Sequence, residues 1–184
     1  MIIGITGTDG AGKGTVVRYL VEQKGFTHYS VRDYILEEMK RRGVEHTRNQ
    51  MRLIGNALRE EFGNDVMIKK PLAQMQKDGV ENVVIESIRA VAEAEKLKEA
   101  GGILIAVDAD QKIRYERVQE RRSSSDKVSF EEFVRHEELE SNDPAPHGLQ
   151  KQKVIGMADY IISNDGTVEE LNVQTERVLQ KVGI

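Results

Sequence analysis

Along this chain, short runs of apolar residues alternate with longer stretches in which apolar residues recur every three or four positions. Three of the runs, IIGIT, NVVIE and GILIAVD, are nearly continuous in aliphatic residues, as strands buried on both faces are. This alternation predicts a three-layer α/β fold in which crossover helices cover a parallel sheet. Five strands are predicted, at 2–6, 27–30, 82–86, 103–108 and 160–163.

Helical patterns fill most of the sequence between these strands. The first predicted helix begins near Lys13. Ser129 with Glu132, and Thr167 with Glu170, have the spacing of capping boxes, so each pair predicts the start of a helix. Further helices are predicted at 32–41, 48–62, 65–77, 91–99 and 111–121.

One block of the chain is more helical than a strand-to-strand crossover requires. Residues of about 31–79 contain several predicted helices where one would suffice. We interpret this block as an insertion that covers a ligand, added to a core of residues 1–30 and 80–184. With 184 residues and a mass of 20.8 kDa, the chain has the size of one domain.

Composition narrows the classes of partner. The chain has 31 acidic and 27 basic residues, a net charge of −4, which argues against binding nucleic acid polymers or anionic membranes. No apolar run approaches the roughly 18 residues of a membrane span, and no secretory signal is visible, so we expect a cytoplasmic protein. There is no cysteine, and the four histidines lack metal-ligand spacing.

A glycine-rich segment after the first predicted strand indicates polyphosphate binding. Gly7, Gly12 and Lys13 have the spacing of a P-loop, between a strand and a helix. Backbone N–H groups, the helix N-terminus and the lysine would together bind the phosphates of ATP. The alternative is an ordinary strand-to-helix turn. The predicted phosphate site comprises Gly7, Thr8, Asp9, Gly10, Ala11, Gly12, Lys13, Gly14 and Thr15.

The end of this loop resembles that of adenylate kinase and related nucleoside monophosphate kinases. Its Gly-Lys-Gly-Thr ending looks like the ending of the loop in those kinases, and its Gly-Thr-Asp-Gly opening is similar to the opening in thymidylate kinases. Gly14 stands where most P-loops have a Ser or Thr whose hydroxyl contacts Mg²⁺. The resemblance implies the P-loop NTPase fold, with Mg²⁺ held largely through water and a more distant carboxylate. Asp9 and Thr15 are further candidates for holding the ion through water, and Thr15 is also a candidate contact for the α-phosphate.

Glu86 is the candidate for that carboxylate. It ends the third apolar run, so it emerges at the carboxyl edge of the sheet beside the P-loop. The segment from Glu86 to Arg89 resembles the Asp-Gly-x-x-Arg element of the adenylate kinase family, in the shortened form of dephospho-CoA-kinase-like and archaeal relatives. The resemblance implies that Glu86 orients metal-bound water and that Arg89 binds the acceptor phosphate. Alternatively, Arg89 is a surface residue paired with Glu93.

The insertion carries a candidate acceptor site. Its predicted second helix carries four polar residues within about 80° of one face, beside an apolar stripe, and this face either presents cations to a pocket or is simply solvated. The four residues are Arg48, Arg52, Asn56 and Arg59.

The segment HYSVRDYI also resembles the Ser-x-Gly-Asp segment that opens the acceptor-binding helix of adenylate kinases. Ser30 and Asp33 are in register with that segment, which implies a role in acceptor binding. The arginine that the family has three residues after the Asp is Leu36 here, and Arg32 is the candidate to replace it.

Arg117 and Arg121 have the Arg-x₃-Arg spacing found at the lid entrance of adenylate and dephospho-CoA kinases. The resemblance implies that one packs on the base of the nucleotide, that the other contacts the transferring phosphates, and that a short lid spans about 121–129. The alternative is an exposed helix on which neighbouring glutamates neutralise both arginines. Asn164 and Gly166 lie in ADYIISNDGT, which resembles the turn beside the donor base in dephospho-CoA kinases; the alternative is a plain turn.

Together these features indicate an ATP-dependent kinase that phosphorylates a nucleoside monophosphate, with Lys13, Arg89, Arg117 and Arg121 as catalytic residues and Mg²⁺ as cofactor. Two alternatives stay open. One is dephospho-CoA kinase activity, in which Asp9 or Asp33 would serve as general base for a hydroxyl acceptor. The other is a regulatory module that binds nucleotide without turnover. The sequence also leaves open which base and which sugar the acceptor carries, and whether ATP or GTP is the donor.

Overall fold

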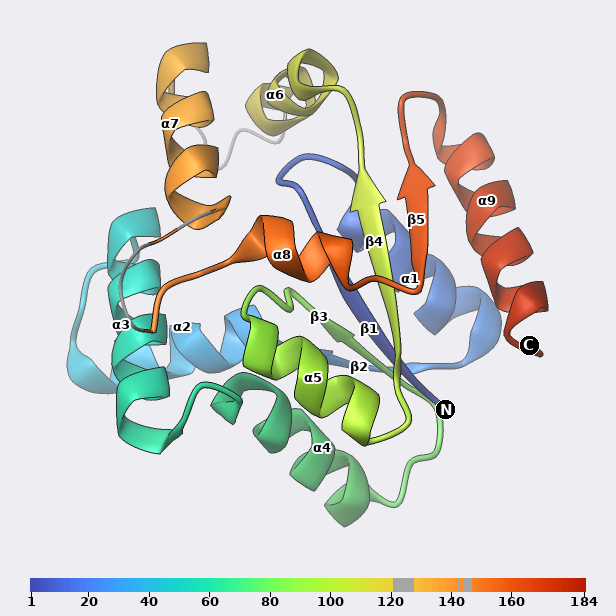
Figure 1. Ribbon diagram of the computed structural model, residues 1–184, viewed down its shortest axis with the longest axis horizontal. Coiled ribbons are helices and arrows are strands. Elements are labelled where there is room, and N and C mark those ends of the chain that lie inside the picture. Colours follow the sequence, from blue (N-terminus) through green and yellow to red (C-terminus); the bar gives the residue numbers. More distant parts are fainter. Residues whose placement is uncertain (121–127, 142, 144–146) are drawn as a thin grey trace.

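The computed structural model describes residues 1–120, 128–141, 143 and 147–184, without the side chain of Arg48 (Figure 1). Five strands form one parallel sheet in the order β2-β3-β1-β4-β5, as the apolar runs predict. The strands are β1 (Ile2–Gly7), β2 (Thr27–Ser30), β3 (Val83–Glu86), β4 (Ile103–Asp108) and β5 (Tyr160–Ser163).

The helices follow the predicted positions within about two residues, with one exception. The exception is α8, which has only six residues and so is too short to show a helical period. Both capping boxes form, because Glu132 and Glu170 exchange hydrogen bonds with Ser129 and Thr167. The described helices are α1 (Lys13–Lys24), α2 (Val31–Arg42), α3 (Arg48–Phe62), α4 (Val66–Asp78), α5 (Val91–Glu99), α6 (Gln111–Glu120), α7 (Phe130–Ser141), α8 (Lys151–Gly156) and α9 (Val168–Lys181).

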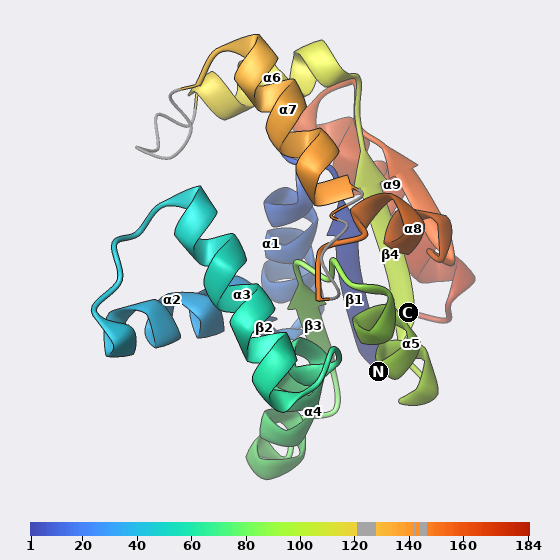
Figure 2. The ribbon, with the colours of Figure 1, turned by 60° about the vertical axis from the view of Figure 1, so that its left-hand side comes forward.

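Helices cover both faces of the sheet, which gives the predicted three layers (Figures 1 and 2). Alternate strand residues point to opposite sides: Val84 joins the apolar core beneath α1 and α9, whereas Ile85 joins the core beneath α2 to α5 and α8. Gly4 lets α5 approach closely, because a Cβ there would lie 2.3 Å from Leu97. Among the described helices, none combines the length and apolar character that a membrane span requires.

The pairing of β1 with β3 brings the segment after β3 beside the P-loop at the carboxyl edge of the sheet. Ile5 is in register with Glu86, so the two strands end side by side. Beyond β3, the Ile88 N–H donates to the carbonyl of Ile5 at 3.2 Å, and the Thr6 hydroxyl donates to the carbonyl of Ile88 at 2.7 Å. These bonds hold the segment that leads to Arg89 against the start of the P-loop.

Helices α2, α3 and α4 occupy the block interpreted as an insertion, and α3 stands beside the P-loop edge of the sheet (Figure 2). A buried ion pair connects α3 to α5: the guanidinium of Arg59 donates to Glu93 at 2.7 and 2.9 Å, and the two side chains are 4% and 1% exposed. The second carboxylate oxygen of Glu93 accepts the N–H groups of Arg89 and Ala90. Glu93 therefore joins the insertion, α5 and the segment after β3.

We expect Arg59→Met to destabilise the protein by about 3–5 kcal/mol, because it leaves the buried Glu93 carboxylate without its cation. Urea unfolding measures the effect. Arg41→Met is the matched control: Arg41 pairs with Glu38 at 2.6 Å but its side chain is 71% exposed, so this variant is expected to unfold close to the wild-type midpoint. Equal losses in the two variants would contradict the structural role of the buried pair.

Candidate functional site

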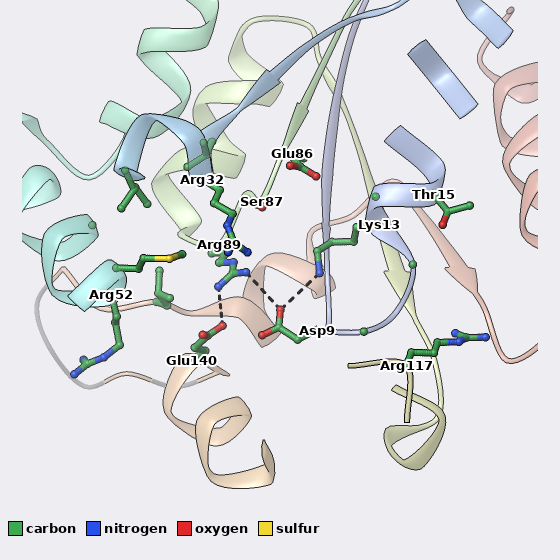
Figure 3. Close-up of a pocket in the computed structure, with 18 of the residues that line it drawn as sticks. Asp9, Lys13, Thr15, Arg32, Arg52, Glu86, Ser87, Arg89, Arg117 and Glu140 are labelled. Carbon is green, nitrogen blue, oxygen red and sulfur yellow. Dashed lines mark hydrogen bonds and ion pairs between the residues drawn. The ribbon is translucent and has the colours of Figure 1, made fainter. Parts of the chain in front are cut away.

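A cavity of about 710 Å³ opens at the carboxyl ends of β1 and β3. Its volume lies in the range of small-molecule sites, and its position is where open α/β sheets bind ligands. It is lined by the P-loop, the segment after β3, the first turns of α2 and part of α3, with Arg117 of α6 and Glu140 of α7 (Figure 3).

The P-loop follows its path because glycines permit it at two points. Gly7 has φ 127°, and a Cβ there would lie 1.9 Å from the carbonyl oxygen of Val107 on β4. Gly12 has φ 100°, and a Cβ there would lie 2.4 Å from the amide nitrogen of Asn164. Both φ angles lie in the positive range that glycine adopts readily, and both close contacts leave no room for a side chain. The loop therefore packs against β4 and the turn after β5 before α1 begins.

Lys13 stands at the centre of the loop. Its ammonium group donates to the carbonyls of Gly7 at 3.1 Å and Thr8 at 2.7 Å, and lies 3.8 Å from Asp9 Oδ1. Burial lowers the pKa of Lys13 from 10.5 to about 8, against the opposing effect of Asp9. An anion that reached this ammonium group would favour its charged form.

Arg89 meets Lys13 at Asp9 (Figure 3). The guanidinium of Arg89 donates to Glu140 Oε2 at 2.8 Å and to Asp9 Oδ1 at 3.4 Å. Glu140 is the largest cause that raises the pKa of Arg89. Glu93 accepts a hydrogen bond from the backbone N–H of Arg89, whereas the guanidinium of Arg89 lies at the cavity rather than on a solvated helix face.

Glu86 lines the cavity at the end of β3. Its Oε1 lies 3.5 Å from His28 Nε2, and a hydrogen bond from His28 is the main reason that the pKa of Glu86 is lowered. The next residue, Ser87, has φ 69°, a left-handed conformation that is uncommon outside glycine. This turn directs the chain from Glu86 back across β1 to Arg89.

The part of the cavity predicted to bind the acceptor combines two arginines with apolar side chains. Arg32 makes no ion pair with any described residue, whereas Arg52 Nη1 lies 3.0 Å from Asp143 Oδ2. The apolar side chains of Val31, Ile35, Met51 and Leu149 line the same cavity. The cavity can therefore contact both a charged group and a flat apolar one.

Other residues predicted for acceptor binding have local partners. Ser30 Oγ caps α2 by accepting the N–H of Asp33, whose side chain is exposed. Arg59 reaches the cavity wall, but its guanidinium is engaged by Glu93 and contacts Asn56 at 3.5 Å. Arg48 begins α3, and its side chain lies outside the described part.

Leu36, which stands at the family's arginine position, packs against the apolar core on the α2 side of the sheet.

The residues predicted for the donor base form one cluster at the other end of the P-loop. Arg117 donates to the carbonyls of Asn164 at 2.7 Å and Gly166 at 3.0 Å, and the Asn164 amide donates to the carbonyl of Ala11 at 2.8 Å. The turn after β5 is thereby held against both α6 and the P-loop. Arg121, and the predicted lid as far as residue 127, lie outside the described residues.

The sequence analysis missed two charged residues of the site. Glu140, near the end of α7, binds Arg89, and Lys151, the first residue of α8, lies 3.1 Å from Glu140 and 3.9 Å from Asp9. Neither belongs to a motif, and they are separated by a proline-containing loop. Only the packing of α7 and α8 against the P-loop edge brings them there.

Comparison with known proteins defines the family. The AAA domain family matches residues 3–143. A UPF0200 protein of Thermococcus sibiricus is 32% identical over 100% of this chain and 96% of its own, and one of Pyrobaculum aerophilum is 34% identical over 97% and 96%. The chain belongs to the AAA domain family and to the same family as these UPF0200 proteins. Both relatives align along nearly their whole length.

Solved structures show that this chain has the fold of P-loop kinases. The shikimate kinase of Bacteroides thetaiotaomicron aligns with a TM-score of 0.64 at 16% identity, over 100% of this chain and 99% of the kinase. The shikimate kinase of Acinetobacter baumannii, solved with shikimate, has a TM-score of 0.60 at 19% identity, over 98% and 92%. At these identities the likeness shows the fold alone.

We expect ATP binding to take up protons at about pH 8.5 but not at about pH 6.5. Above its pKa of about 8, a large part of Lys13 is neutral, and a bound polyanion raises that pKa. At the lower pH Lys13 is already charged. Calorimetry without divalent cations, in buffers of different ionisation enthalpy, counts the protons. Lys13→Arg keeps the charge at both pH values and is expected to bind ATP without uptake; equal uptake in this variant would assign the proton to another group.

Proposed function

We propose that this protein is a kinase that transfers the γ-phosphoryl group of ATP to a nucleoside monophosphate, giving ADP and a nucleoside diphosphate. The observation that carries the proposal is the meeting of Lys13 and Arg89 at Asp9, at distances of 3.8 and 3.4 Å. Lys13 belongs to the P-loop, and Arg89 lies between the P-loop and the insertion. The two cations thus lie between the expected donor and acceptor sites.

The donor half of the proposal follows from the P-loop. Backbone N–H groups and the N-terminus of α1 would bind the phosphates, and Lys13 would bind the β- and γ-phosphates. Arg117, which binds the carbonyls of Asn164 and Gly166, lies beyond Asp9 from Arg89 (Figure 3). We assign the donor base to this cluster.

The acceptor half rests on charge and shape. Three arginines, Arg32, Arg52 and Arg89, line one side of the cavity together with apolar side chains of α2 and α3. Guanidinium groups form strong hydrogen bonds with phosphate, and the apolar side chains can pack against the face of a nucleotide base. A phosphate-bearing acceptor would use both features, whereas an acceptor without an anionic group would leave the arginines unused. We therefore assign helices α2 to α4 as the acceptor-binding insertion.

The chemistry requires positioning and charge stabilisation. In the transfer, the bond between the γ-phosphorus and the bridging oxygen of ATP breaks, and a bond forms to a phosphate oxygen of the acceptor. The acceptor oxygen is already ionised, so no general base is needed. Lys13 and Arg89 would stabilise the negative charge on the transferring group, and the sequence assigns Arg121 to the same task.

The residues present are suited to Mg²⁺ brought with ATP. Among the described residues no group of three or more potential ligands forms a metal cage. Mg²⁺ on nucleotides typically keeps several waters and uses one or two carboxylates besides the phosphates, and Asp9 and Glu86 line the cavity beside the P-loop. When bound, the ion would neutralise charge on the phosphates. Asp9, Glu86 and the Thr15 hydroxyl would hold its water shell.

An acceptor panel tests the proposal. Purified protein is incubated with Mg²⁺ and ATP plus AMP, CMP, UMP, GMP, their deoxy forms, TMP, dephospho-CoA or shikimate, and ADP formation is followed with mass spectrometry of the acceptor. We expect one nucleoside monophosphate to accelerate ADP formation and to become a diphosphate. Transfer to dephospho-CoA alone would show that dephospho-CoA, and not a nucleoside monophosphate, is the acceptor. ATP binding without any acceptor-dependent turnover would favour a regulatory nucleotide-binding module.

We expect Arg89→Met to lower kcat by about 10²–10³, the usual loss for one transition-state contact, with a smaller change in the KM for ATP. Arg41→Met removes an exposed arginine of α2 and is expected to leave kcat near the wild-type value. Steady-state kinetics with the accepted nucleotide measures both. A wild-type kcat in Arg89→Met would remove Arg89 from the proposed transfer site.

Gly14 offers a test of metal binding. Apart from the neighbouring backbone of α1, no atom of the described residues lies within 4 Å of a Cβ built at Gly14, so a larger residue fits. We expect Gly14→Ser to lower the Mg²⁺ concentration for half-maximal turnover by about three- to tenfold, the effect of one added polar contact. Gly14→Ala is the control, because it has the gain in helix propensity, up to about 1 kcal/mol, without the hydroxyl. The same Mg²⁺ requirement in both variants would contradict the placement of the ion.

A further inference from the structure

A buried lysine lies behind the cavity and is not used by the proposed transfer. The side chain of Lys151 is 1% exposed, and Lys151 is not among the residues that line the cavity. A buried ammonium group is unfavourable unless carboxylates compensate it. Its partners are Glu140 Oε2 at 3.1 Å and Asp9 Oδ1 at 3.9 Å. Lys151 therefore meets the residues that line the cavity through these two carboxylates.

Both carboxylates are shared with Arg89. Glu140 Oε2 lies 2.8 Å from Arg89 Nη1, and Asp9 Oδ1 lies 3.4 Å from Arg89 Nη2. Lys151 and Arg89 thus contact the same two oxygens. Arg89 reaches the cavity and its side chain is 27% exposed, whereas Lys151 is enclosed by the protein.

This sharing matters when a phosphate enters the cavity. Arg89 must exchange Glu140 and Asp9 for phosphate oxygens, and a carboxylate left buried without a cation is strongly unfavourable. For Glu140, Lys151 prevents that situation, because it stays paired with this carboxylate while Arg89 turns to the phosphate. Asp9 also keeps Lys13, at 3.8 Å. Without Lys151, Glu140 would hold Arg89 in place.

We propose that Lys151 is a positioning residue, which remains paired with Glu140 and Asp9 and so releases Arg89 to bind the transferring phosphoryl group. The proposal rests on the function proposed above, in which Arg89 contacts that group. It assigns a role to α8, the helix that the sequence did not predict, and to Glu140 of α7.

The first measurement compares Lys151→Met with Lys151→Arg and with Lys153→Met, an exposed lysine of the same helix. We expect Lys151→Met to lower kcat by at least about tenfold while the KM for ATP changes less than about threefold, since the P-loop is intact. Lys151→Arg retains a buried cation and is expected to recover most of the activity. A kcat of Lys151→Met equal to that of Lys153→Met would overturn the proposal.

A pair of double variants separates release of Arg89 from a general effect of charge. Glu140→Gln with Lys151→Met restores the net charge and removes one carboxylate that holds Arg89, so we expect recovery of at least about threefold over Lys151→Met. Glu137→Gln with Lys151→Met restores the same charge, but Glu137 pairs with Arg114, not Arg89. No recovery is expected there. Equal recovery in both, or recovery in neither, would overturn the proposal.

A measurement of phosphate binding tests the role of Lys151 without requiring turnover. ADP-saturated protein is titrated with inorganic phosphate by calorimetry, and unfolding temperatures show that each variant is folded. We expect weaker phosphate binding in Lys151→Met and recovery only with Glu140→Gln. If the wild-type protein phosphorylates no acceptor but this pattern holds, the proposed function fails while the role of Lys151 stands. If turnover occurs and this pattern is absent, the role of Lys151 is wrong.

Discussion

The pairing of β1 with β3 is the constraint on which the site depends. Because Ile5 lies in register with Glu86, the P-loop and the segment to Arg89 leave the sheet side by side. Two further hydrogen bonds, between Ile5 and Ile88 and between Thr6 and Ile88, hold that segment after the strand has ended. Residues about 80 positions apart in sequence thereby reach the same carboxylate, Asp9.

Charge compensation governs the arrangement around that carboxylate. Lys13, Arg89 and Lys151 surround Asp9, and Glu140 pairs with the latter two, so three cations face two carboxylates. The cations would repel one another without these carboxylates. The excess of one positive charge within this group suits a site whose ligand is a polyanion. The low pKa of Lys13, about 8, reflects burial together with repulsion by Arg89 and Lys151.

The C-terminal half of the chain completes the site around the P-loop. Helix α7 supplies Glu140 for Arg89 and Glu137 for Arg114, and Arg114 in turn donates to the carbonyl of Asp9 at 3.2 Å. Helix α8 supplies Lys151. The turn after β5 supplies Asn164, which binds the carbonyl of Ala11. The fold therefore holds its P-loop from several elements outside the loop, of which α7 and α8 carry no recognisable motif.

The sequence by itself determined the three-layer fold, the strands, most helix boundaries and the P-loop, because these depend on local periodicity, caps and glycine spacing. It also placed Glu86 and Arg89 at the correct sheet edge, since the end of a buried strand is visible in sequence. Only the tertiary structure decided that Arg59 pairs with Glu93 and that Glu140 and Lys151 join the site. The physical reason is that buried charges find partners through packing between distant elements, and no spacing along the chain records that choice.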